Sequence, residues 1–302
     1  MESYRNAHVA KKIAIWAGTV LLLLFVLGPI LWMVDSSFQG EVALTSRPSQ
    51  LIPQNPTIAN YLYVFTGKIP TSSAENGAGP ATRVSQEARE VLRAMKNSSI
   101  VAAAVMLINL VFGALAAYSF ARFRFRGRET MFNFLLGSRL LPVIAIAIPY
   151  YVIIKTLNLL DTYTGLILVY LTLTLPFTVW FLRRYFEGIP REVEEAALVD
   201  GCTPMRALLR VVLPISASGL AASGAFAFMT SYNEFLLALL LTETIRSQTL
   251  PVILASVATN PDASLALTAT CVTLAMVPPA LIATVLARYM TRGVATMAGY
   301  SQ

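Results

Sequence analysis

Long apolar stretches separated by short polar segments dominate the pattern of this chain. Six of them reach the roughly 20 residues that a helix needs to cross the hydrocarbon core of a bilayer. They cover residues 13–34, 98–121, 131–154, 162–182, 215–242 and 265–287. None alternates apolar and polar positions as barrel strands do, and only helices or closed barrels satisfy their backbone hydrogen bonds in lipid. The pattern predicts an all-α integral membrane protein with six transmembrane helices, forming a single transmembrane domain over residues 1–302.

The first apolar run follows a basic segment, as the apolar part of a signal peptide would. At about 22 residues it is too long for a signal peptide, and no small-x-small cleavage site follows it. We therefore expect an uncleaved first span.

The distribution of arginine and lysine among the short loops predicts the orientation of the chain. The short loops of one side hold only Lys155 and Arg246, whereas the other side carries many basic residues. These are Arg5, Lys11, Lys12, Arg122, Arg124, Arg126, Arg128, Arg183, Arg184, Arg191, Arg206, Arg210, Arg288 and Arg292. By the positive-inside rule the basic side is cytoplasmic, and so are both termini.

The long loop 38–96 is then extracytoplasmic. Its residues 47–80 are rich in Pro, Gly, Ser, Thr and Asn, which predicts irregular structure. Residues 85–96 carry an apolar stripe opposite charged positions, which predicts an amphipathic helix lying on the membrane surface or on the next span.

Composition agrees with a membrane protein and argues against several kinds of site. Of the 302 residues, 56% are hydrophobic and 13% are charged, against roughly 25% charged in soluble domains. The net charge is +7, but the basic residues cluster beside the apolar spans, so they indicate membrane topology rather than nucleic-acid binding. His8 is the only histidine, and Cys202 and Cys271 fall on opposite sides of the predicted topology, so neither a histidine metal site nor a disulfide is expected. Gly67-Lys68 lacks the glycine spacing of a P-loop.

One polar stretch on the basic side, residues 188–214, predicts two short helices joined by a sharp turn. Pro190 suits the first helical position, and residues 191–199 are helix formers with acidic side chains near the positive end of the helix dipole. Gly201 stands where a left-handed C-terminal residue is favoured. Thr203 predicts the cap of a second helix, which Pro204 opens and which ends at residues 213–214.

The first of these helices has an apolar face that could serve docking. By helical spacing we expect that face to contain Ile189, Val193, Ala196 and Ala197. The two alanines are small enough to enter a partner's groove, with charges from Glu195 and Asp200 at the margin. From residue types alone, the favoured interpretation is a surface helix that packs on the protein's own membrane domain.

The spacing of this stretch resembles the EAA loop of ABC importer permeases. That signature is EAA, three residues, Gly, nine residues, Ile, one residue, Leu-Pro, and here only Val211 departs from it, standing for Ile. The resemblance implies a coupling helix that docks on a cytoplasmic ATPase subunit. The residues carried over to that role are Glu195, Ala196, Ala197, Asp200, Gly201, Leu213 and Pro214.

Other segments extend the resemblance from about residue 13 to the end of the chain. Residues 138–142 (SRLLP), 158–168, 230–242 and 290–299 are similar to carbohydrate permeases of the maltose-transporter type, specifically the shorter six-span partner; the insertion 66–82 is the least typical part. This implies a bacterial or archaeal cytoplasmic membrane and the import of a sugar. The implied partners are a second permease in a heterodimer, two ATPase subunits and an extracytoplasmic substrate-binding protein. ATP and Mg²⁺ would be bound by the ATPase subunits, so we expect this chain to be a transporter subunit without catalytic, cofactor or metal sites.

Two ionisable residues, Arg139 and Glu234, fall inside predicted spans, where charges are costly and usually face an aqueous cavity or a partner. With Asn109 and Asn233 they predict a polar lining of the translocation path. A structural ion pair and a contact with the second permease remain alternatives. Arg139 also raises the hypothesis of an anionic sugar.

Other functions stay open at this level. The chain could be an ABC permease for a polyol or for a sugar phosphate or sulfonate. A proton-coupled carrier would use Glu234 and Arg139 as a relay. A structural or assembly protein would have no transport role. An intramembrane enzyme is disfavoured because the sequence offers no nucleophile–base or metal-ligand constellation.

Overall fold

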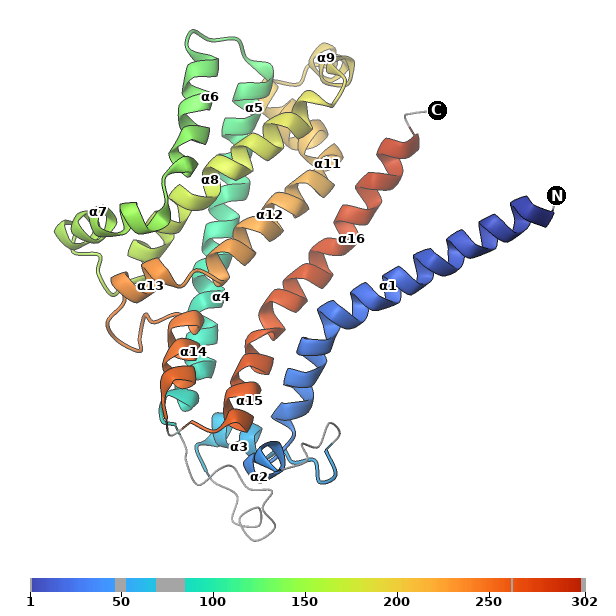
Figure 1. The fold of residues 1–302 in the computed structure, drawn as a ribbon. Coiled ribbons are helices and arrows are strands. Elements are labelled where there is room, and N and C mark those ends of the chain that lie inside the picture. Colours follow the sequence, from blue (N-terminus) through green and yellow to red (C-terminus); the bar gives the residue numbers. More distant parts are fainter. Residues whose placement is uncertain (1, 47–52, 69–84, 262, 300–302) are drawn as a thin grey trace. The chain divides into compact units, whose positions relative to one another are not determined.

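The computed structural model describes residues 2–46, 53–68, 85–261 and 263–299, and the regular structure in these ranges is helical (Figure 1). Four helices within them are long and apolar enough to cross a membrane: Lys11–Ser37, Glu87–Arg122, Tyr163–Glu187 and Leu265–Tyr289. Two bent helix pairs pass the same test only when each pair is taken together. The predicted all-α membrane fold is confirmed, with four to six spans. Most of the loop segment predicted to be irregular lies outside the described residues, but its described part contains a helix, Ala59–Thr66, so the prediction is wrong there.

The chain forms two units, of which the first comprises Met1–Arg89 and Ser256–Leu274. It contains α1 (Glu2–Ser37), α2 (Glu41–Thr45), α3 (Ala59–Thr66) and most of α15 (Leu265–Ala275). Side-chain hydrogen bonds tie the end of α1 to its neighbours: the Asn60 amide donates to the Gln39 carbonyl oxygen at 3.1 Å, and the Thr270 hydroxyl donates to that of Ser37 at 3.2 Å. No residue in the most apolar stretch of α1, 18 residues long, is buried.

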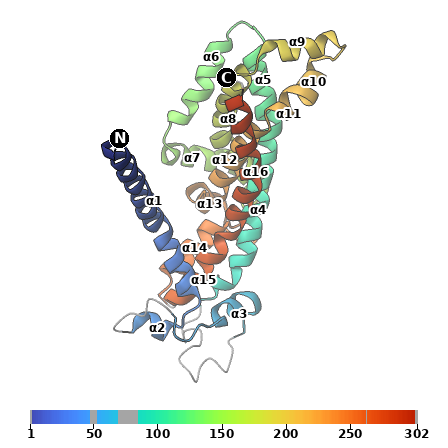
Figure 2. The same ribbon diagram turned by 90° about the vertical axis from the view of Figure 1, so that its right-hand side faces the viewer.

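The second unit, Glu90–Ala255 and Ala275–Gln302, is a helical bundle. It holds α4 (Val91–Ile108), α5 (Ala114–Arg122), α6 (Arg128–Gly137), α7 (Val143–Thr156), α8 (Tyr163–Glu187), α12 (Ala217–Tyr232), α13 (Leu236–Leu241), the start of α14 (Leu250–Thr259) and α16 (Val277–Gly299). Helix α8 packs on α4, α5 and α12, while α12 also packs on α4 and α16 (Figures 1 and 2). The close approach of the chain at Gly113 to α8 needs a small residue, since a Cβ on Gly113 would lie 2.6 Å from Cγ2 of Thr178.

Three predicted stretches differ in the structure. The predicted amphipathic segment 85–96 is not a separate surface helix, because the helix Glu87–Arg122 runs through it into the second span. The stretch 131–154 breaks after a short 3₁₀ turn, Ser138–Leu140, and the two halves are bent by 101°. Proline disfavours helical backbone in the preceding residue, and Leu141 before Pro142 is extended, with φ −71° and ψ 126°.

The stretch 215–242 is likewise divided. The helices Pro204–Ile215 and Ala217–Tyr232 meet at an angle of 81° at Ser216. Helix α12 then ends at Tyr232, and α13 starts afresh at Leu236. The predicted fifth span is therefore one helix with a break at each end rather than one continuous helix.

Candidate functional site

The first helix of the polar stretch, α9 (Arg191–Val199), lies at the same end of the second unit as the α5–α6 turn (Figure 2). Its end is closed by two backbone hydrogen bonds: Gly201 N–H donates to the Leu198 carbonyl, and Cys202 N–H donates to that of Ala197, both at 3.0 Å. This is a Schellman arrangement, which needs a left-handed residue, and Gly201 has φ +85°. The predicted helix bounds and the role of Gly201 in the turn are confirmed.

The second helix begins as predicted and ends differently. The Thr203 hydroxyl accepts a hydrogen bond from Arg206 N–H, and α10 (Pro204–Ala207) starts at Pro204. A π-helical turn, Leu208–Val212, follows it and leads into α11 (Leu213–Ile215). The predicted end at residues 213–214 is therefore too early. Pro214 lies near the end of the helix Pro204–Ile215, which continues through the π-helical turn, and the chain bends only at Ser216.

The structure divides the apolar face that helical spacing predicted, because Ile189 and Ala197 are buried as one face would be, whereas the other two positions are not. Val193 and Ala196 are exposed, and the face turned inward carries Glu194 and Ala197. The Glu194 carboxylate pairs with Nε of Arg122 at 2.7 Å, and the side chains of the two are only 11% and 8% exposed. This ion pair turns the charged position inward, because a carboxylate beside an arginine can be buried whereas an unpaired one cannot.

Two further hydrogen bonds complete the link between α5 and α9. The Tyr118 hydroxyl donates to the Glu194 carboxylate, and a terminal nitrogen of Arg122 donates to the Ile189 carbonyl at 3.0 Å. Arg122 and Tyr118 both belong to α5, so a membrane helix holds α9 by two bonds to Glu194 and holds the segment just before α9 by a third, to Ile189. The link between Glu194, Arg122 and Tyr118 was not predicted from the sequence. The available signal was that Glu194 lies three positions before Ala197, on the same side of the helix.

The opposite face of the polar stretch is open. Glu195, Ala196 and Asp200 are exposed, and the apolar side chains of Val199 and Met205 are 87% and 53% exposed. Small and apolar positions edged by acidic ones suit a protein contact better than a lipid contact. Leu213 is half-buried and Pro214 is exposed.

Arg139 lies at the break between α6 and α7. Its guanidinium carbon is 5.6 Å from the ring centroid of Phe177 and 5.7 Å from that of Phe226, and the two rings stack at 3.8 Å. The Arg139 side chain is exposed, and no carboxylate among the described residues forms an ion pair with it. Attraction to the ring faces therefore positions the charge while leaving its N–H donors accessible.

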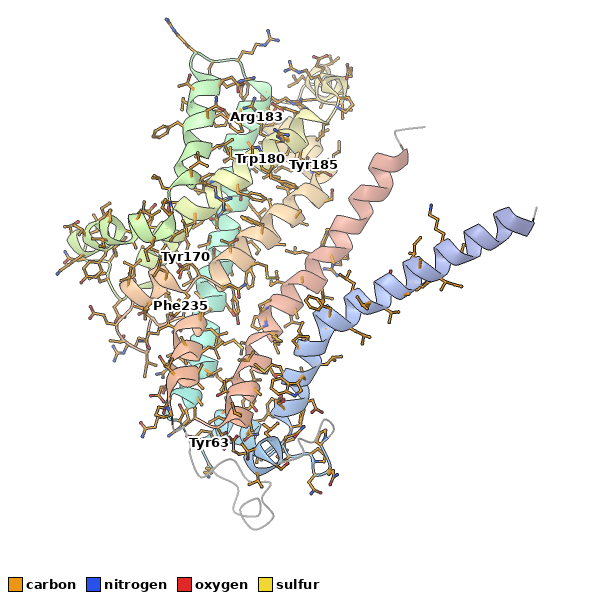
Figure 3. The ribbon with its side chains drawn as sticks, viewed as in Figure 1. Tyr63, Tyr170, Trp180, Arg183, Tyr185 and Phe235 are labelled. Carbon is orange, nitrogen blue, oxygen red and sulfur yellow. The ribbon has the colours of Figure 1, made fainter. Side chains whose placement is uncertain are left out.

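Asn233 and Glu234 lie at the other break, between α12 and α13. The Glu234 carboxylate accepts hydrogen bonds from the backbone N–H of Leu237 at 3.0 Å and of Ala238 at 3.0 Å, so it caps α13. Glu234 also interacts with the buried Tyr170, and Figure 3 shows Tyr170 on α8 on the same side as α13. The exposed Asn233 amide donates to the Met229 carbonyl at 2.9 Å.

Asn109 does not join these groups at an open surface. It is fully buried, and its amide donates to the Thr174 hydroxyl and the Val105 carbonyl, each at 2.8 Å. It therefore links a π-helical turn, Asn109–Gly113, to α8.

Comparison with known proteins decides the family. A family model described as the binding-protein-dependent transport system inner membrane component matches residues 88–296. The chain belongs to this family. The sulfoquinovosyl glycerol transport system permease protein of Agrobacterium fabrum is 33% identical to it over 77% of this chain and 74% of its own. The trehalose/maltose transport system permease protein of Thermococcus litoralis is 32% identical over 81% of each chain.

The fold agrees with a solved structure. A chain in the crystal structure of a bacterial ABC transporter involved in the import of the acidic polysaccharide alginate superposes with a TM-score of 0.73, covering 93% of this chain and 97% of its own. Its 20% sequence identity makes this a likeness of fold alone. The chain is therefore a multi-pass inner-membrane permease of an ABC importer, with no catalytic role or cofactor of its own and with ATP hydrolysis on a separate subunit.

The end of the permease away from α9 is held by a polar latch. The Asp161 carboxylate accepts hydrogen bonds from the backbone N–H of Glu243 and Thr244, at 2.9 Å each, and from the hydroxyls of Thr244 and Ser247. Partial burial would raise the pKa of Asp161, but these hydrogen bonds outweigh it and lower the pKa to about 2. The Asn97 amide adds a hydrogen bond to the Gln248 carbonyl at 2.9 Å. The loop after α13 is thus attached to two other helix ends.

Proposed function

We propose that this permease forms, with a second permease, the translocation path for a carbohydrate, and that α9 and the turn after it transmit the motion of an ATPase subunit. The observation that carries the proposal is the attachment of α9: a buried ion pair joins it to α5, while its opposite face stays open. A helix held in this way can pass a push on its outer face to the membrane bundle. Glu195, Ala196, Asp200 and Gly201, which are exposed, would meet the ATPase, and the buried Ala197 would pack beneath them against the bundle. Leu213 and Pro214 would lead the motion into α12.

The breaks at Arg139 and at Asn233–Glu234 support the proposed path. Discontinuous helices in transporters leave polar groups and backbone accessible to solutes at membrane depth. Arg139 stands about 16 Å along the helix from Arg128, at 1.5 Å per residue, close to half the hydrocarbon thickness of about 30 Å. An exposed charge at that depth needs water, a solute or a partner chain.

A carbohydrate is supported by what the names of the relatives say. One transports sulfoquinovosyl glycerol, another trehalose or maltose, and the structural neighbour imports alginate. The family description says that transport depends on a binding protein, which in this proposal lies outside the cytoplasm and delivers the solute.

We also propose that the α9 end is cytoplasmic, with both termini on that side. The α5–α6 turn, the end of α8 and the start of α9 together carry many arginines, among them Arg183 at the end of α8 (Figure 3). Short loops rich in arginine remain on the cytoplasmic side. The two permeases, two ATPase subunits and binding protein would then form one importer.

Co-purification from native membranes in mild detergent tests the coupling role. The tagged wild-type chain should retain an ATPase subunit and a second permease. Gly201→Asp adds a charge and a strained backbone to the outer turn, so it should lose the ATPase while keeping the second permease. Gly127→Asp is the matched control, because Gly127 also has positive φ, +82°, and open space around it, but lies outside α9 and its turn. Loss of the ATPase from both variants, or from neither, would contradict the proposal.

A further inference from the structure

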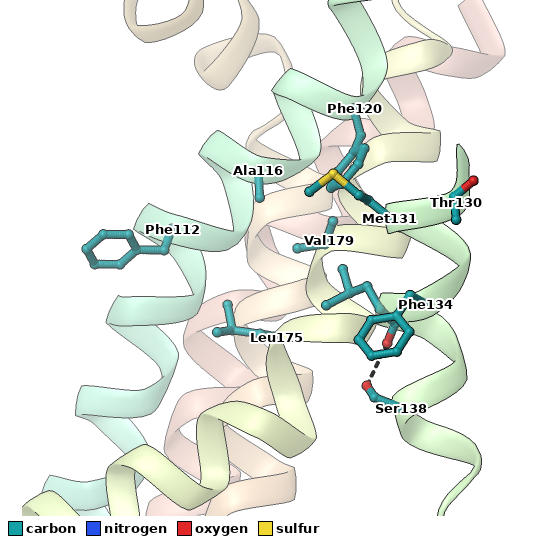
Figure 4. A pocket seen from close by; sticks show the side chains of 10 residues that line it. Phe112, Ala116, Phe120, Thr130, Met131, Phe134, Ser138, Leu175 and Val179 are labelled. Atoms are coloured by element: carbon teal, nitrogen blue, oxygen red, sulfur yellow. Dashed lines mark hydrogen bonds between the residues drawn. The ribbon is translucent and has the colours of Figure 1, made fainter. Parts of the chain in front are cut away.

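An apolar cleft of about 780 Å³ lies between α5, α6 and α8 (Figure 4). One wall carries Phe112, Ala116 and Phe120, spaced four residues apart on one helical face. The facing wall, on α6, includes Met131 and Phe134, and no charged residue lines the cleft. The Phe134 side chain is 81% exposed, so the cleft opens to the outside of the described chain.

The cleft has the length of one membrane leaflet. Its lining runs from residue 112 to 120 on one wall and from 130 to 138 on the other, a rise of eight residue steps along each. At 1.5 Å per residue this is about 12 Å, against about 15 Å for half of the hydrocarbon core. An apolar cleft of this length, set in a membrane helix bundle, suits a hydrocarbon chain.

The turn at the upper end of the cleft joins aromatic and basic side chains. Phe125 packs on Phe120 with ring centroids 5.7 Å apart, so the turn after α5 adjoins the cleft at Phe120. Phe123 is 47% exposed, and Arg124 and Arg126 are exposed. Exposed aromatic and basic side chains together are typical of the headgroup level of a bilayer.

The two arginines of this turn differ from their neighbours. At the same end, Arg122 pairs with Glu194, Arg128 with Glu129, and Arg183 with Glu129 and Glu187. Within the described residues, no ion pair forms at Arg124 or Arg126. Two unpaired positive charges above an uncharged cleft complement a ligand with an anionic head and an apolar tail.

We propose that this cleft binds an anionic phospholipid. One acyl chain lies along α5 and α6, and the phosphate accepts hydrogen bonds from Arg124 and Arg126, which can contact phosphate oxygens in a bidentate manner. The lipid would sit next to Arg122, which holds α9, so its binding stabilises the end of α5 to which the coupling helix is attached.

Native mass spectrometry of the purified importer, titrated with phosphatidylglycerol or phosphatidylcholine in mild detergent, tests the headgroup. The wild type should retain phosphatidylglycerol preferentially. Arg124→Gln with Arg126→Gln should reduce that retention roughly 25-fold, from about fivefold per basic residue at the headgroup level. Lys155→Gln with Arg246→Gln removes the same charge near the latch end and should leave retention unchanged. An equal loss in both double variants, or no loss in the first, would overturn the proposal.

Photo-crosslinking tests the tail and identifies any other occupant. Phe134 is replaced by benzoylphenylalanine in the full complex, and the adducts are identified by mass. A phospholipid adduct is the expected result, and it should diminish in the Ala116→Phe variant, whose larger side chain occupies the cleft. A crosslink to the second permease would refute lipid binding and assign the cleft to a helix of that subunit. This test remains decisive if the arginine variants fail to assemble.

Discussion

Replacing Glu194 with glutamine should loosen α9 without altering any group on its outer face. The substitution keeps an oxygen that can accept the Tyr118 hydroxyl but removes the charge that pairs with Arg122. Arg122 would then remain buried without a carboxylate partner, and its hydrogen bond to the Ile189 carbonyl would remain. A buried arginine left without its carboxylate is the reason to expect a large effect.

The magnitude follows from the burial of the pair. Breaking a buried ion pair by removing one partner costs about 3–5 kcal/mol. The remaining hydrogen bonds of Arg122 place Glu194→Gln near the lower end, about 3 kcal/mol. If α9 opens locally, its opening equilibrium should rise about a hundredfold.

Hydrogen–deuterium exchange of the assembled importer in a membrane mimic measures this directly. Amides of residues 195–203 should exchange about a hundredfold faster in Glu194→Gln, and stimulation of ATPase activity by loaded binding protein should fall. Glu192→Gln is the matched control, since Glu192 lies in the same helix and is exposed. Its exchange and ATPase stimulation should resemble the wild type.

A double-mutant cycle decides whether the ion pair is the cause. Arg122→Gln combined with Glu194→Gln leaves no unpaired charge, so its effect should be smaller than the sum of the two single effects. Additive effects, or an exchange rate in Glu194→Gln within threefold of the Glu192→Gln control, would refute the assigned link between α5 and α9.

Three further substitutions test other parts of the structure. Gly201→Ala places a Cβ at φ +85° and should destabilise the turn by about 1 kcal/mol. Hydrogen–deuterium exchange should then be faster at the end of α9, and Gly201→Asn should be less affected because asparagine tolerates this conformation. Asp161→Asn should destabilise the latch by about 1–2 kcal/mol at pH 7 after allowance for solvent. Because the pKa of Asp161 in the folded protein is depressed to about 2 from 3.8, this contribution to stability is present above about pH 4 and is lost as the pH falls toward 2. Protease sensitivity of the 242–250 loop should therefore rise with acid in the wild type and be independent of pH in that range in the variant. Gly113→Ala should lower thermal stability by about 1–3 kcal/mol through overpacking, and Thr178→Ser should restore it by removing the methyl group 2.6 Å away.

The sequence by itself determined the features that depend on neighbouring residues. Long apolar runs identify the spans because a helix in lipid must be both apolar and long. The bounds of α9, the cap at Thr203 and the left-handed Gly201 follow from hydrogen bonds that join residues at most five positions apart. The EAA spacing likewise lies within one short stretch, so the order of residues along the chain is enough to show its resemblance to the permease family.

Only the tertiary structure decided which face of α9 is buried. Helical spacing defines candidate faces but not the neighbour that each one meets, and the partner of Glu194 is Arg122, 72 residues away. Asn109 is a second example. The sequence shows only that it lies in a span, and the packing of the helices is what buries it against Thr174. The 101° and 81° bends also depend on three dimensions: an apolar run shows that a segment enters the membrane, but proline, caps and contacts with other helices determine whether it crosses as one helix.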